Sequence, residues 1–141
     1  MRRIFIALFS LTVGIGAVQS RASAGDISVA EAGARYGQAK SAAKFCPGGR
    51  VTTKAETLAQ SYTGENIAVF KAEEVKVTEA WDKAFSCIEI DPNTNRTTQC
   101  RKMRITSCRQ AWIEIGVEGR NIQGLLDVDF AAWEAEGSKN K

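Results

Sequence analysis

Apolar residues recur at every third or fourth position along most of the chain from residue 26 onward, which is the spacing of one face of an α-helix. In residues 26–46 the repeating positions are Val29, Ala32, Tyr36, Ala39, Ala43 and Cys46. Most of these side chains are small, so we expect a partner helix to approach this face closely. Ser28 and Glu31 form a capping box at the start of this helix, and Pro47-Gly48-Gly49 ends it.

A short helix and then a long helix are predicted next. Thr52 or Thr53 caps the short helix, which ends near Ser61. The long helix spans about residues 65–87. Its apolar stripe consists of Ile67, Phe70, Val77, Trp81, Ala84 and Ile88.

A turn-rich segment at residues 91–95 precedes a fourth helix over about residues 98–117. The apolar stripe of this helix consists of Ile105, Cys108, Trp112 and Ile115. The pattern as a whole predicts an all-α fold, a small bundle of about four helices. Residues 86–105 also alternate between apolar and polar side chains, so an α+β fold with a short hairpin in this segment is the alternative.

The first residues have the three-part pattern of a secretory signal. Arg2-Arg3 is a basic start, residues 4–18 are mainly apolar, and Ala22-Ser23-Ala24 offers small residues to a signal peptidase. We therefore predict a signal peptide over residues 1–24, exported by the ordinary or the twin-arginine route. The apolar run of about 15 residues is shorter than the roughly 20 that a membrane-spanning helix needs.

Cleavage after the signal leaves a single helical domain over residues 25–136 and a frayed tail over residues 137–141. Residues 25–141 contain 16 basic and 16 acidic side chains, because three arginines and no acid lie in the signal. This balance gives no reason to expect nucleic-acid binding. No second apolar span follows, so we expect no transmembrane span after cleavage and a periplasmic or secreted location.

The four cysteines are Cys46, Cys87, Cys100 and Cys108. An even number in a short exported chain indicates two disulfides, and the intervals of 41, 13 and 8 residues do not fit a four-thiolate zinc site. Cys87 and Cys100 flank the predicted turn at similar distances, so we predict that they pair with each other. Cys46 then pairs with Cys108. The crossed pairing, Cys46 with Cys100 and Cys87 with Cys108, is the alternative.

The fourth predicted helix is rich in basic residues, namely Arg101, Lys102, Arg104 and Arg109. Such a cluster is typical of a site for an anionic partner. In the structural interpretation, Lys102, Arg104 and Arg109 flank the apolar stripe of this helix. They face the acids that flank the stripe of the long helix, namely Glu73, Asp82 and Glu89, and these charges fix the register of an antiparallel helix pair. We favour the structural interpretation, because these charges flank two apolar stripes.

The chain contains no histidine, which excludes catalytic triads and the common zinc and haem motifs that depend on it. Acids gather near the end of the chain at Asp127, Asp129, Glu134 and Glu136. Paired carboxylates are one route to catalysis, but Asp127 is better explained as the cap of a last short helix that carries Phe130 and Trp133. The aromatic side chains are expected in the core.

These observations favour an exported small helical protein that acts by binding or structural support, without a cofactor or metal. Its partner would be another exported protein or an envelope component. The alternatives are a small exported enzyme that uses paired carboxylates, and a binder of an anionic surface.

Overall fold

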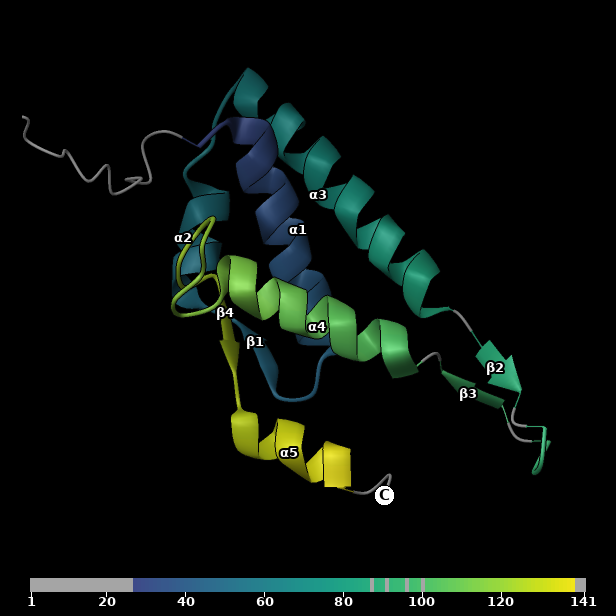
Figure 1. Cartoon of the computed structure of the whole chain (residues 1–141). Helices are drawn as coiled ribbons and strands as arrows, with labels where there is room; N and C mark the ends of the chain where they lie inside the picture. The colour runs from purple at the N-terminus through teal and green to yellow at the C-terminus, as the bar shows by residue number, and fades with distance from the viewer. Residues whose placement is uncertain (1–26, 87, 91, 96, 100, 139–141) are drawn as a thin grey trace, which may run out of the picture.

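The computed structural model describes residues 27–138 apart from residues 87, 91, 96 and 100, and it leaves out the side chains of 88, 89, 97–99, 101–104 and 136–138. The helices are α1 (Val29–Phe45), α2 (Thr53–Gln60), α3 (Glu65–Phe85), α4 (Arg101–Ile115) and α5 (Phe130–Ser138). The strands are β1 (Gly49–Val51), β2 (Ile88–Ile90), β3 (Thr97–Gln99) and β4 (Leu126–Val128). The described chain is thus mostly helical, as predicted, with two small sheets in addition (Figure 1).

The antiparallel hairpin β2–β3 lies where the α+β alternative placed it. In its register Ile88 faces Gln99 and Ile90 faces Thr97. The expected fourth helix therefore begins at Arg101 rather than near residue 98. Figure 1 shows the hairpin projecting from the end of α3, away from the other elements.

Helices α1 and α3 lie along one another and form the largest helix pair (Figure 1). Gly33 and Gly37 face the α3 backbone so closely that a Cβ atom added at Gly37 would lie 2.7 Å from the carbonyl oxygen of Glu74. Phe70 is fully buried in this interface, with its ring 5.6 Å from that of Tyr36. The close approach expected for α1 is therefore present, with glycines at its tightest points.

We expected α3 to pack mainly against α4 as an antiparallel pair. In the structure α3 packs mainly against α1 instead. Asp82 of α3 pairs with Lys44 of α1, with 2.7 Å between the ammonium nitrogen and a carboxylate oxygen. Trp81 stacks on Phe85 of its own helix. The hairpin β2–β3 explains this difference, because it carries the chain away from α3 before α4 returns across α1 (Figure 1).

Strands β1 and β4 form the second sheet, in which Arg50 faces Asp127. Thr52 caps α2 by accepting a hydrogen bond from the backbone N–H of Ala55. Its hydroxyl also donates to the carbonyl of Gly124, with 2.6 Å between the oxygen atoms. This contact ties the start of α2 to the loop that precedes β4.

A disulfide joins Cys46, at the end of α1, to Cys108 in α4. It is the pairing predicted for these two residues, and it spans 62 positions of the sequence. Cys87 and Cys100 lie outside the described residues, so their pairing stays a prediction. The predicted signal peptide, residues 1–24, lies outside them as well.

No helix among the described residues is both long and apolar enough to cross a bilayer. This finding and the disulfide are compatible with an exported protein.

Candidate functional site

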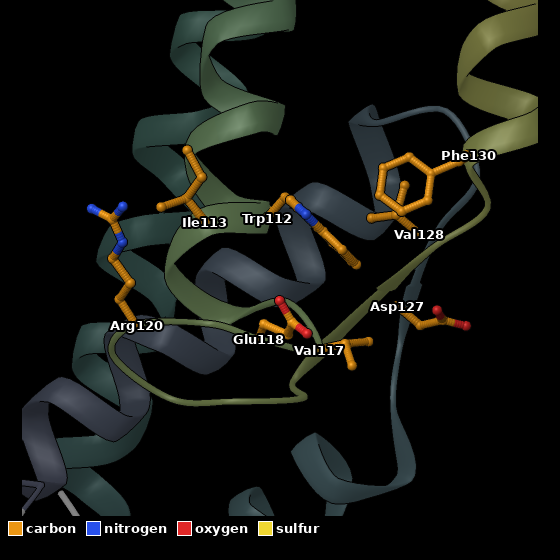
Figure 2. A pocket seen from close by; sticks show the side chains of 8 residues that line it. All are labelled: Trp112, Ile113, Val117, Glu118, Arg120, Asp127, Val128 and Phe130. Atoms are coloured by element: carbon orange, nitrogen blue, oxygen red, sulfur yellow. The ribbon is translucent and has the colours of Figure 1, made fainter. Parts of the chain in front are cut away.

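Helix α4, strand β4, the start of α5 and the loop after α4 border two adjoining cavities. Figure 2 shows the side chains that line the larger one. The smaller has a volume of about 170 Å³ and is lined by Cys46, Cys108, Arg109, Trp112, Leu126, Val128, Phe130 and Trp133. The larger has a volume of about 590 Å³ and is lined by Trp112, Ile113, Val117, Glu118, Arg120, Asp127, Val128 and Phe130. Trp112, Val128 and Phe130 line both cavities. We call the combined site the α4–α5 groove.

Trp112 lines both cavities, and the position of its ring depends on Gly116, one helical turn later in the chain. A Cβ atom added at Gly116 would lie 2.7 Å from Cε3 of the indole. A side chain at residue 116 would therefore displace the ring. The rings of Trp112 and Phe130 meet edge to face at a centroid distance of 4.9 Å. Figure 2 shows Phe130 and Val128 on one side of the indole and Ile113 and Arg120 on the other.

The loop between α4 and β4 folds back on the end of α4. Backbone N–H groups of Arg120 and Asn121 donate to the carbonyls of Ile113 and Glu114, which are the carbonyls that a helix end leaves unpaired. Leu125 donates in the same way to Ile115. These bonds fix the backbone on both sides of Val117 and Glu118, which line the larger cavity.

The position of α5 is set by Asp129. Its carboxylate accepts hydrogen bonds from the backbone N–H groups of Ala131 and Ala132, so Asp129 is the cap of this helix. Its own N–H donates to the carbonyl of Gly48. The expectation that Asp127 caps the helix is wrong, because the carboxylate of Asp127 instead pairs with Arg50 across the sheet at 2.7 Å.

The smaller cavity is apolar apart from one charged group. Cys46 and Cys108 form its disulfide wall, and both are almost fully buried. Arg109 is the only charged residue that lines this cavity within the described chain. The cavity thus offers an apolar space beside a single cation.

Of the four basic residues that the sequence analysis named, the structure describes the side chain of Arg109 alone. Arg109 is exposed and lines the groove, but it forms no ion pair within the described part of the chain. Its predicted pairing with acids of α3 is therefore wrong, and Glu73 pairs with Lys76 instead. The side chains of Arg101, Lys102 and Arg104 lie outside what the structure describes.

Sequence reasoning missed Arg120, and it favoured a core position over a cavity lining for Trp112 and Phe130. Arg120 is exposed, lines the larger cavity and has no ion-pair partner in the described chain. Trp112 and Phe130 were expected in the core because they follow helical spacing. Phe130 is instead 53% exposed. The cluster of Gly116, Gly119 and Gly124 was the available signal, because it marks a loop able to fold back on a helix end.

Two partly or fully buried carboxylates lie elsewhere, and both are held by cations or amide donors. Burial raises the pKa of Glu74, but the hydrogen bonds and charges of Lys40 and Lys71 outweigh it, so the pKa is lowered. Burial likewise raises the pKa of Glu114, and hydrogen bonds from Gln110 and Gln38 together with Arg35 bring it below its ordinary value. A general acid at neutral pH needs a raised pKa, so neither group suits that role.

The acids near the end of the chain are also engaged in structure. Asp127 forms an ion pair and Asp129 caps α5. Glu134 is exposed, and the side chain of Glu136 lies outside the described residues. The structure therefore brings none of the described members of this group together as a catalytic pair.

Among the described residues, no three side chains of the metal-binding types come together as a metal site. Comparisons of the chain with models of known protein families, with curated proteins and with solved structures found no match.

Proposed function

We propose that this protein is an exported binding protein, and that it holds an apolar segment of another exported polypeptide in the α4–α5 groove. The observation that carries this proposal is the exposure of large apolar side chains at a concave site. Phe130 is 53% exposed and Val117 is 58% exposed, and both line the groove beside Trp112. A concave apolar surface with a few polar groups at its edge is typical of a binding site.

The dimensions of the groove favour a polypeptide. An apolar cavity of about 150 Å³ is large enough to hold benzene, so the smaller cavity of about 170 Å³ suits one ring-sized or branched side chain. The adjoining cavity of about 590 Å³ is larger and carries polar groups at its edge. One anchor side chain with the neighbouring chain beside it is a common binding arrangement.

The charges of the groove support binding over the other two functions. Asp127 forms an ion pair and Asp129 caps α5, and the pKa values of the more buried Glu74 and Glu114 are lowered, which gives no support to the enzyme with paired carboxylates. Arg109 and Arg120 each line a cavity together with the aromatic side chains of Trp112 and Phe130. This arrangement suits a segment with both apolar and acidic character more than an anionic surface.

Selection from a random peptide library displayed on phage, with the oxidised protein as target, tests the proposal. Peptides that bind should carry one large apolar residue. Their affinity should fall at least tenfold for F130A, because this variant removes a ring that lines both cavities. Since Phe130 is half exposed, F130A should keep the melting temperature of the wild type.

Ile90→Ala is the matched control, because Ile90 is 65% exposed on the hairpin and away from the groove. It should bind the selected peptides as the wild type does. Peptides whose affinity is unchanged by F130A, or a selection that yields no binding peptide, would overturn the proposal. Sedimentation with anionic phospholipid vesicles that is lost in R109Q but retained in F130A would favour the anionic-surface alternative and overturn it as well.

A further inference from the structure

The smaller cavity combines two features that a ligand has to match at once. Its lining is apolar around Trp112 and Trp133, and its single charged residue in the described chain is Arg109. The guanidinium group of Arg109 has no carboxylate partner in the described chain. A matching ligand therefore carries an anion close to a ring-sized apolar group.

We infer that the groove recognises the C-terminal residue of its polypeptide partner, with an aromatic or branched side chain in the smaller cavity and the α-carboxylate paired with Arg109. This inference rests on the proposed binding function and specifies the partner. In a C-terminal residue the carboxylate and the side chain are attached to the same Cα atom, so the anion has to lie beside the cavity that the side chain fills. Guanidinium groups bind carboxylates with two parallel hydrogen bonds, which also fixes the orientation of the chain end.

An internal segment fits the smaller cavity less well. Its anchor residue has a peptide group on each side, and each of these groups needs a hydrogen-bond partner when it is removed from water. The walls formed by Leu126, Val128 and Phe130 offer apolar side chains at this point. A chain end has a peptide group on one side only, and its charged carboxylate is satisfied by Arg109.

The larger cavity then receives the residues that precede the C-terminus. Arg120 and Glu118 line it, and neither forms an ion pair within the described chain. Because Arg120 and Glu118 have opposite charges, the larger cavity can accept either acidic or basic residues before the C-terminal residue of the partner. Selectivity is therefore concentrated in the last residue.

Fluorescence anisotropy with pairs of N-terminally labelled peptides tests this inference. Each pair has the same sequence ending in phenylalanine, once as the free acid and once as the C-terminal amide. We expect the free acid to bind at least about fivefold more tightly. In R109Q the acid and the amide should bind equally, whereas R120Q, the matched control in the same groove, should keep the preference for the acid.

The outcomes separate this inference from the proposed function. Equal binding of acid and amide to the wild type, with both weakened by F130A, would overturn the inference and leave the binding function in place. Loss of the acid preference in R120Q and not in R109Q would overturn the assignment of Arg109. N-acetyl-phenylalanine that binds as tightly as the peptide would identify a small aromatic acid as the ligand, and it would overturn the polypeptide source. The absence of any F130A-sensitive peptide binding would overturn both proposals.

Discussion

Glu74 is the buried charged residue of the described chain, only 4% exposed, and it faces α1 from α3. Lys40 and Lys71 approach its two carboxylate oxygens at 2.7 and 2.6 Å. The same ammonium groups lie 5.7 and 5.9 Å from the ring centre of Tyr36. The side chains of both lysines are about half exposed, so their charges keep part of their hydration while they compensate the buried carboxylate.

Replacing Glu74 with glutamine should lower the free energy of unfolding by about 1–2 kcal/mol at pH 7, because charge-assisted hydrogen bonds are lost. The pKa of Glu74 is lowered from its ordinary value of 4.5. Its contribution is therefore fully present above about pH 4.5 and is lost as the pH falls through the lower pKa of the folded state. Urea unfolding followed by circular dichroism should give wild-type and E74Q stabilities that converge as the pH falls below 4.5.

Glu73→Gln is the neighbouring control, since its pair with Lys76 is 3.3 Å long and largely exposed on the lysine side. E73Q should change the stability by less than about 0.5 kcal/mol at any pH. A constant difference between E74Q and wild type across the whole pH range would contradict the ionic role of Glu74.

The ends of individual helices could be predicted from local sequence signals, but the helices against which they pack could not. Ser28 caps α1 by accepting a hydrogen bond from the N–H of Glu31, as the sequence predicted. Such a signal involves residues within one turn, so it can be recognised without the rest of the fold.

The helix against which α3 packs could not be predicted in this way. Glu74 interrupts the apolar stripe of α3, and Ile67, which was expected on that stripe, is 45% exposed. The residues that select α1 as the partner are Gly33 and Gly37, which apolar periodicity does not count.

Gly33→Ala should lower the free energy of unfolding by about 2–3 kcal/mol, although alanine is the better helix former by about 1 kcal/mol. The added methyl group would collide with the backbone carbonyl of Phe70, so α1 and α3 would have to separate. Gly37→Ala should also destabilise the protein, by a smaller amount, since its nearest contact at 2.7 Å is longer. Thermal unfolding of both variants measures these costs.

The control for these variants is Ala72→Ser on the exposed face of α3, which should change the stability by less than about 0.5 kcal/mol. A G33A protein that is as stable as the wild type would show that the two helices are not packed through this glycine.

At the scale of the whole molecule, the candidate groove is made by pairings between distant parts of the chain. Strand β4 pairs with β1, which places Val128 and Phe130 beside the residues of α4. From the sequence alone Trp112 and Phe130 have the spacing of core residues, and nothing local indicates that they share a cavity. The pairing of Cys46 with Cys108 was predictable, because few arrangements of four cysteines agree with a turn near residues 91–95 and a helix through Cys108.

The two disulfides, one observed and one predicted, should differ in their effect on the groove. Replacing Cys46 and Cys108 with serine removes a link that closes a loop of 62 residues, worth about 4 kcal/mol in the chain-entropy model. It also removes a wall of the smaller cavity, so peptide binding that depends on Phe130 should be lost even under conditions where the variant stays folded.

Replacing Cys87 and Cys100 with serine should cost about 3 kcal/mol if these residues close the predicted 13-residue loop, but peptide binding should be unchanged. The reason is that the hairpin β2–β3 projects away from the groove (Figure 1). The described register ends at the pair Ile88 and Gln99, and Cys87 and Cys100 are the next residues of the sequence on either side of that pair. Peptide mapping of the unreduced protein should therefore find Cys46 linked to Cys108 and Cys87 linked to Cys100. A crossed map would contradict both the pairing and the groove, because Cys46 and Cys108 could not then form its common wall.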